Sequence, residues 1–217
     1  MKAVVFDMDG VLFDTERLSR DAWSVIGEKY GFAGLNEVAI ECIGLNVTDI
    51  RAMMKKRFGE DFSYDIFREE EHEWVEREIE KKGIPVKVGV QEILSYLKKS
   101  GYLVGLASST SKRSVRKHLE RAGLTSYFQT VITGDMVKHS KPKPDIYLMA
   151  CKELGVEPKE AYAIEDSPNG IRSAHGAGMC PIMVPDLMQP DEEMQGLSSY
   201  IFRDLLEVKA FLEKGQE

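Results

Sequence analysis

The chain has 217 residues, of which 43% are hydrophobic and 30% charged, and its net charge is −7. This is the composition of an ordinary globular protein that is long enough to bury a core. The negative charge argues against a nucleic-acid-binding protein, which normally presents a basic surface. No stretch approaches the roughly 18 consecutive apolar residues of a membrane span, so we expect neither nucleic acid nor membrane as a partner.

The three cysteines, Cys42, Cys151 and Cys180, form no CxxC pair. An odd number without paired spacing argues against a disulfide framework or a zinc site and favours a reducing compartment. The apolar run at the N-terminus is too short for a signal peptide and leads into aspartates. We therefore expect a cytoplasmic protein, and nothing in the sequence requires more than a monomer.

The first predicted strand, KAVVFD at residues 2–7, leads into the segment DMDGVLFDT. Its apolar residues 3–6 are followed at once by Asp7, and Asp9 comes two positions later. Two carboxylates at the end of a buried strand repel each other unless a positive charge joins them. This segment therefore predicts a bound metal ion.

Residues 16–83 contain no convincing strand. Helical character is seen in residues 16–31, 36–44, 48–59 and 63–83. In the last segment Phe67, Trp74, Val75 and Ile79 lie roughly on one helical face, so the charge run of residues 70–82 is expected to face solvent. The pattern predicts an all-helical insertion.

From residue 84 onward, predicted helices and strands alternate. Helices are expected at residues 90–97, 111–123, 144–155 and 169–178, and strands at 103–109, 130–135, 161–166 and 179–185. Together with the first strand, this order is typical of a parallel sheet with helices on both faces. The sequence thus predicts an α/β protein with a doubly wound, Rossmann-like core of residues 1–15 and 84–217, interrupted by a helical domain of residues 16–83.

Polar residues gather where the predicted strands end, which is where open α/β sheets bind ligands. These residues, together with one glycine and with one lysine from a nearby loop, are Asp7, Asp9, Ser108, Ser109, Thr110, Gly134, Asp135, Lys141, Glu165 and Asp166. The hydroxyls and backbone N–H groups of the 108–112 turn suit phosphate oxygens. The carboxylates suit a hard cation such as Mg²⁺. The combination predicts a phosphate site beside a metal.

Four segments carry a family resemblance: DMDGVLFDT, the turn at Ser108, Lys141 in SKPKPD, and EDSPNG at residues 165–170. In order and context they resemble the four motifs of the haloacid dehalogenase-like (HAD) hydrolase superfamily. The chain resembles in particular its β-phosphoglucomutase-like phosphatase branch, whose helical cap domain is inserted just after the first motif. The resemblance covers the whole chain and implies that the α/β core is catalytic.

The resemblance also implies roles for individual residues. Asp7 would be the nucleophile that forms an aspartyl-phosphate intermediate. Asp9 would act as the general acid for the leaving group and then as the base for water. Ser108, Ser109 and Lys141 would bind the transferring phosphoryl group.

The implied cofactor is Mg²⁺, for which Mn²⁺ or another divalent cation can substitute. Its ligands would be the Asp7 and Asp166 carboxylates and the Asp9 backbone carbonyl, with Glu165 in support. A dehalogenase of the same superfamily lacks an aspartate at the position of Asp9, so dehalogenation is disfavoured.

The resulting prediction is a Mg²⁺-dependent phosphatase for a small phosphorylated metabolite, most plausibly a sugar phosphate. One alternative is a β-phosphoglucomutase-type phosphomutase, and a remoter one is a catalytically silent binding or regulatory protein. Mutases of this branch are associated with a hinge histidine and a cap-loop lysine, where alignment places Ser19 and Ile43. The intact motif residues argue against a silent protein.

Overall fold

The computed structural model describes residues 1–32, 34–35, 38–39 and 47–215. The chain divides into two compact units, one formed by Met1–Asp14 with Val86–Glu217 and the other by Thr15–Pro85. These boundaries lie within two residues of the predicted positions at 15/16 and 83/84.

The larger unit is built on a six-stranded parallel sheet with the order β3-β2-β1-β4-β5-β6. The strands are β1 (Ala3–Phe6), β2 (Leu103–Ser108), β3 (Thr130–Thr133), β4 (Ala161–Glu165), β5 (Cys180–Met183) and β6 (Tyr200–Ile201). Every residue of β1 is buried, because the strand lies inside the sheet and is covered on both faces. This explains the unbroken apolar run before Asp7.

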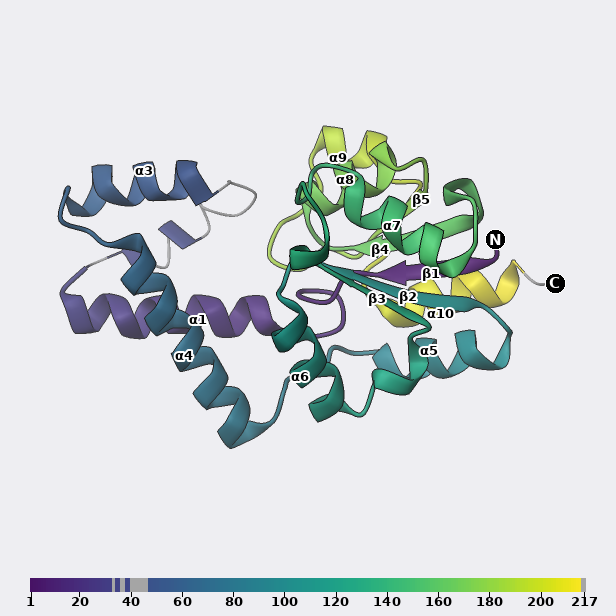
Figure 1. Cartoon of the computed structure of the whole chain (residues 1–217), viewed down its shortest axis with the longest axis horizontal. Coiled ribbons are helices and arrows are strands. Elements are labelled where there is room, and N and C mark those ends of the chain that lie inside the picture. Colours follow the sequence, from purple (N-terminus) through teal and green to yellow (C-terminus); the bar gives the residue numbers. More distant parts are fainter. Residues whose placement is uncertain (33, 36–37, 40–46, 216–217) are drawn as a thin grey trace. The chain divides into compact units, whose positions relative to one another are not determined.

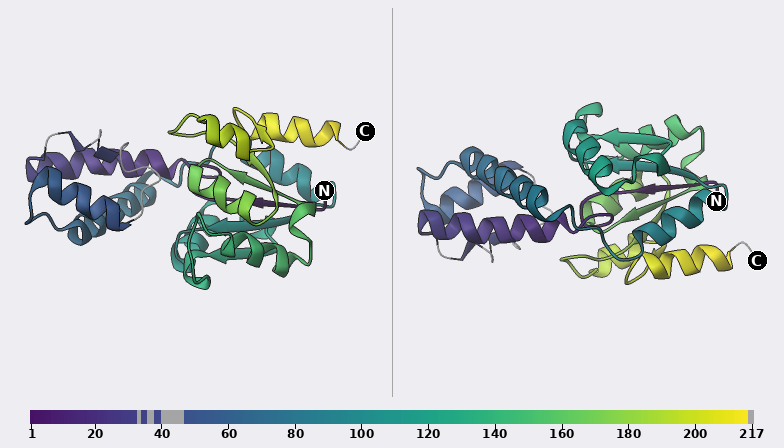
Figure 2. Two further views of the ribbon diagram at one scale, coloured as in Figure 1. Left: turned by 90° about the horizontal axis from the view of Figure 1, so that it is seen from above. Right: turned by 90° about the horizontal axis from the view of Figure 1, so that it is seen from below.

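Helices cover both faces of this sheet (Figures 1 and 2). They are α5 (Val90–Lys99), α6 (Lys112–Ala122), α7 (Asp145–Leu154), α8 (Pro168–Gly176), α9 (Glu192–Leu197) and α10 (Leu205–Lys214). Ala3 and Val5 of β1 share a buried cluster with Ile146 of α7 and Ala174 of α8. Strand side chains alternate between faces, and α5 and α10 lie on the other side of the sheet (Figure 1). The predicted doubly wound α/β fold is confirmed.

Three elements after residue 185 have no counterpart in the prediction: α9, β6 and α10. Strand β6 has two residues and α9 has six, which is too short for a periodic pattern to be recognised. Helix α10 does begin at a good capping residue, since the Asp204 side chain accepts the N–H groups of Leu206 and Glu207.

The smaller unit contains helices and no strand among its described residues. The helices are α1 (Thr15–Tyr30), α3 (Val47–Phe58) and α4 (Tyr64–Lys82). Their buried faces form one cluster that includes Trp23, Met54, Phe67 and Ile79, and the rings of Trp23 and Phe67 meet edge to face at 4.9 Å. The predicted helix at residues 36–44 falls almost wholly outside the described residues.

One residue of the predicted solvent-facing charge run is buried instead. Glu71 of α4 is only 3% exposed, and its carboxylate pairs with Arg68 one helical turn earlier. The exposure prediction was therefore wrong at this position, because a paired carboxylate can be buried at lower cost than a lone one.

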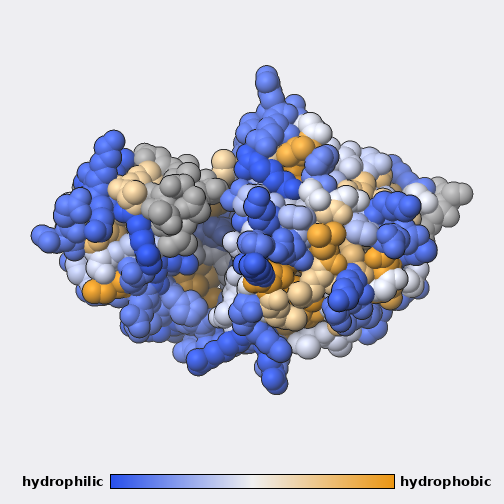
Figure 3. Space-filling view, turned by 45° about the horizontal axis from the view of Figure 1, so that its top comes forward, coloured by the Kyte–Doolittle hydropathy of each residue, from blue (hydrophilic) through white to orange (hydrophobic). Residues whose placement is uncertain are grey.

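None of the described helices has the length and apolar character needed to cross a membrane. Hydrophilic residues cover most of the face seen in Figure 3, and hydrophobic residues form scattered areas on it. This surface agrees with a chain in which 30% of the residues are charged.

Candidate active site

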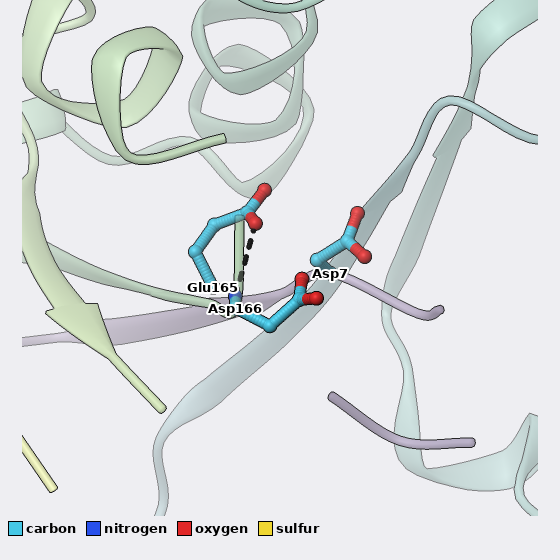
Figure 4. Close-up of side chains that lie close together, drawn as sticks. All are labelled: Asp7, Glu165 and Asp166. Atoms are coloured by element: carbon cyan, nitrogen blue, oxygen red, sulfur yellow. Dashed lines mark hydrogen bonds between the residues drawn. The ribbon is translucent and has the colours of Figure 1, made fainter. Parts of the chain in front are cut away.

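The parallel pairing of β1 with β4 brings three carboxylates together. Phe6 is paired with Ile164, and the backbone N–H of Asp7 donates to the Ile164 carbonyl at 2.9 Å. Both strands end here, so Asp7 follows β1, while Glu165 is the last residue of β4 and Asp166 follows it. One carboxylate oxygen from each of the three lies within 4.8 Å of the others, and the Asp166 carboxylate points toward Asp7 (Figure 4).

Two glycines allow this close approach. Gly10 has a φ of 80°, which favours glycine, and a Cβ at this residue would lie 2.2 Å from an Asp166 carboxylate oxygen. A Cβ at Gly170, in the first turn of α8, would lie 1.9 Å from the Glu165 carboxyl carbon. The glycines of the DMDG and SPNG segments are therefore part of the site because a side chain would occupy the space of a carboxylate.

Lys141 joins two of the carboxylates. Its ammonium group donates to Asp7 Oδ1 at 2.5 Å, to Glu165 Oε1 at 2.6 Å and to the Ala107 carbonyl at 2.9 Å. Burial by itself disfavours the charged ammonium, but the charges of Asp7 and Glu165 outweigh it and raise the pKa of Lys141. Lys141 is thus a positive charge held in the site by three acceptors.

The single lysine does not neutralise the site. Burial raises the pKa of Asp7 to about 8, Lys141 opposes this rise, and the carboxylates of Glu165 and Asp9 add to it. A second positive charge is needed to keep Asp7 ionised at neutral pH. The oxygen-only donors Asp7, Glu165 and Asp166 are of the kind that a hard divalent cation prefers, so the residues fit a magnesium ion.

A turn between β2 and α6 lies beside Asp9. Ser108, at the end of β2, is buried, and its hydroxyl accepts the N–H of Thr110 at 3.1 Å. The Thr110 hydroxyl donates to Asp9 Oδ2 at 2.8 Å. Ser111 caps α6 by accepting the N–H of Ser114. Hydroxyls and a helix start are therefore located where an anion could bind.

The sequence profile of the haloacid dehalogenase-like hydrolases matches residues 4–184, a span that includes every residue of this site. The chain belongs to this family. A Thermotoga maritima protein named phosphorylated carbohydrates phosphatase is 33% identical over 179 residues, which is 82% of each chain. Hexitol phosphatase A of Escherichia coli is 32% identical over 183 residues, or 84% of this chain and 82% of that protein.

A solved structure extends the family assignment to the fold. A Thermotoga maritima protein assigned as a β-phosphoglucomutase superimposes with a TM-score of 0.81 over 99% of each chain, at 29% identity. The structures therefore share both the parallel-sheet unit and the helical insertion after the first strand. The predicted family and branch are confirmed.

In this HAD-family chain Glu165 has its carboxylate surrounded by donors. It is fully buried, and Oε1 accepts from Lys141 and from the Tyr147 hydroxyl at 2.7 Å. Oε2 accepts from the Asp166 N–H at 3.2 Å and the Ser167 hydroxyl at 3.2 Å. These bonds suit Glu165 for holding Lys141 and the following turn.

The structure brings most of the predicted site residues together, but not all in the same way. Asp7, Lys141, Glu165 and Asp166 form one connected group. The Asp9 side chain instead contacts the 108–112 turn, and Ser109 is exposed.

Sequence reasoning missed Tyr147, which lies on α7 just after the Lys141 loop. The sequence pattern places it in the predicted helix of residues 144–155 and gives it no role in the site. The usable signal is that a buried tyrosine hydroxyl needs a partner, and Tyr147 is fully buried with its hydroxyl on Glu165.

Proposed function

We propose that this protein is a Mg²⁺-dependent phosphatase that hydrolyses phosphate monoesters of small metabolites, foremost sugar phosphates. The observation that carries the proposal is the Asp7 carboxylate at the end of a buried strand, bonded to Lys141 and facing Asp166. The names of two relatives, which refer to phosphorylated carbohydrates and hexitols, support the substrate class.

The proposed reaction has two steps that balance in atoms and charge. A carboxylate oxygen of Asp7 attacks phosphorus, the bond from phosphorus to the sugar oxygen breaks, and Asp9 gives that oxygen its proton. Asp9 then removes a proton from water, whose oxygen attacks the phosphorus of the aspartyl-phosphate. The bond between phosphorus and the Asp7 oxygen breaks and inorganic phosphate leaves, so that Asp7 is again a carboxylate and Asp9 is again protonated.

The other site residues would hold the phosphoryl group and the cation. Lys141 and the hydroxyls of Ser108 and Ser109 supply positive charge and donors to phosphate oxygens. The Asp7 and Asp166 carboxylates and the Asp9 backbone carbonyl would hold Mg²⁺. When bound, the ion offsets negative charge shared between the carboxylates and the phosphate.

The cytoplasmic location and the monomeric state stay predictions from the sequence. The distinction from a phosphomutase rests on Ser19, which lies in α1, and on Ile43, which is outside the described residues. Neither side chain offers the titratable ring or the positive charge associated with the mutases. Phosphatase activity is therefore the favoured proposal.

A phosphate-release screen over sugar phosphates, nucleotides and p-nitrophenyl phosphate tests the proposed function. In one arm, β-glucose 1-phosphate is incubated with Mg²⁺ and a trace of glucose 1,6-bisphosphate, and both inorganic phosphate and glucose 6-phosphate are followed. We expect phosphate without isomerisation. Rapid formation of glucose 6-phosphate with little phosphate would identify a mutase, and no turnover of any compound would favour a silent protein.

Replacing Lys141 by Ala should lower kcat/KM by about 10²–10³, the usual loss when one donor to a developing negative charge is removed. Its buried partners Asp7 and Glu165 would lose their shared cation, which should also destabilise the fold by about 3–5 kcal/mol. Kinetics and urea unfolding measure the two effects. Lys143→Ala is the matched control, since Lys143 belongs to the same loop and is exposed. Equal kinetics for both variants would remove Lys141 from the site.

Replacing Asp9 by Asn should slow sugar phosphate hydrolysis by about 10²–10⁴, the range for loss of general acid–base assistance. With p-nitrophenyl phosphate, the rate of phosphoryl transfer to Asp7 should fall much less, because p-nitrophenolate leaves without needing a proton. Steady-state and burst kinetics on both substrates provide the measurement. An equal loss on the two substrates in the phosphoryl-transfer step would contradict the role of Asp9 as the acid.

A further inference from the structure

The Thr110 hydroxyl makes a contact that an anion-binding turn does not require. It donates to Asp9 Oδ2 at 2.8 Å, a normal length for a bond from a hydroxyl to a carboxylate. Both residues are partly buried, so water competes less for this bond than at an open surface. The bond connects the end of β2 to the loop after β1.

Thr110 is itself held at its backbone. Its N–H donates to the Ser108 hydroxyl at 3.1 Å, and its carbonyl accepts the N–H of Gly134 at 3.1 Å. Gly134 begins the short helical turn after β3, and a Cβ there would lie 2.2 Å from the Ser109 carbonyl oxygen. Only a residue without a side chain lets this segment approach the turn so closely.

Asp135 adds a second connection from the same segment. Its carboxylate accepts the N–H of Lys112, the first residue of α6, at 3.2 Å. The Thr133 hydroxyl donates to the same carboxylate oxygen at 2.5 Å, and these bonds lower the pKa of Asp135, with Thr133 as the largest cause. The 108–112 turn is thus bonded at Thr110 and at Lys112 by the segment after β3.

We propose that Thr110 is a positioning residue that holds the Asp9 carboxylate in place for proton transfer. The inference rests on the proposed phosphatase function. A hydroxyl on one carboxylate oxygen restricts rotation of the Asp9 side chain, and the branched Cβ of threonine limits its own rotamers. The hydrogen bonds to the Thr110 backbone hold its hydroxyl in place, and the hydroxyl in turn holds the Asp9 carboxylate. This matters because small displacements of a reacting group strongly reduce the reaction rate.

The same hydroxyl could instead bind substrate phosphate, and the two roles predict different kinetics. A positioning role lowers kcat for substrates whose leaving group needs a proton and leaves phosphate affinity unchanged. A phosphate-binding role weakens every substrate and inorganic phosphate alike. Leaving-group dependence therefore separates them.

The experiment compares Thr110→Val, Thr110→Ala and Thr110→Ser with the wild type and with Asp9→Asn. Thr125→Val is the control, because Thr125 is exposed. We expect Thr110→Val and Thr110→Ala to lose about 10–100-fold in kcat on a sugar phosphate, the scale of a lost bond to a charged group. The loss on p-nitrophenyl phosphate in the burst phase should be under threefold, and Thr110→Ser should recover most of the activity. The inhibition constant of inorganic phosphate should not change.

Three outcomes would overturn the inference. Equal losses on both substrates together with weaker inhibition by inorganic phosphate would assign Thr110 to phosphate binding. Leaving-group dependence in Asp9→Asn but not in the Thr110 variants would reject the positioning role and leave the proposed function intact. No dependence in Asp9→Asn would reject the role of Asp9 and the inference together.

Discussion

Asp7→Asn is expected to abolish turnover while the protein stays folded. The amide that replaces the carboxylate cannot attack phosphorus, so no aspartyl-phosphate forms. Stability should not fall, for a reason that follows from the raised pKa of Asp7, about 8. At a pH above the ordinary pKa of an aspartate, Asp7 is ionised in the unfolded chain. In the folded metal-free protein burial disfavours the ionised carboxylate, so Asp7 lowers the free energy of unfolding at neutral pH. A neutral amide removes this penalty, and the metal-free variant should unfold at the same or a higher temperature than the wild type.

Three measurements test the Asp7 prediction: phosphate release, thermal unfolding without metal, and intact mass after rapid quenching with substrate. The wild type should gain the mass of one phosphoryl group in the quenched sample, and Asp7→Asn should not. Asp61→Asn is a control at an exposed carboxylate. Near-normal turnover by Asp7→Asn would rule out the covalent route.

Removal of divalent cations should also abolish activity. Without a divalent cation, the carboxylates of Asp7, Asp9 and Asp166 would repel the phosphate dianion. Lys141 does not prevent this, because its positive charge is already bonded to Asp7 and Glu165. EDTA should stop turnover, and Mg²⁺ or Mn²⁺ should restore it. Ca²⁺ should support activity poorly, because its larger and less regular coordination would displace the nucleophile.

Thermal unfolding gives a second measurement of the metal that does not depend on activity. A ligand that binds the folded state raises the unfolding temperature, so Mg²⁺ should stabilise the wild type. Asp166→Asn should reduce this shift, whereas Asp61→Asn should preserve it. Full activity after rigorous metal removal would contradict the role of the cation, and an unchanged shift in Asp166→Asn would exclude Asp166 as a ligand.

The core was predictable because its signals are local. Apolar strands that end in polar residues, and helices that end in glycine, alternate along residues 84–185, so the parallel sheet followed from the chain order. The last part of the chain was not predictable in the same way. Strand β6 has two residues, and it exists because it pairs with β5 at Ile182 and Met183 rather than because of its own pattern.

The sequence by itself determined which residues stand at the strand ends and to which family the chain belongs. Asp7, Asp9, Lys141 and Asp166 lie in motifs whose order and spacing are readable without coordinates. The residues that follow a strand lie at the carboxyl end of the parallel sheet, and this does not depend on the packing elsewhere.

Only the tertiary structure decided how these groups are paired. Tyr147 contacts Glu165 through its hydroxyl, Lys141 bridges Glu165 to Asp7, and Thr110 bonds to Asp9. Each contact joins segments that are distant in sequence, and its geometry depends on side-chain rotamers and on how closely the backbones approach. Such close approaches, as at Gly134 against the Ser109 carbonyl, result from the packing of the whole sheet, which no local pattern encodes.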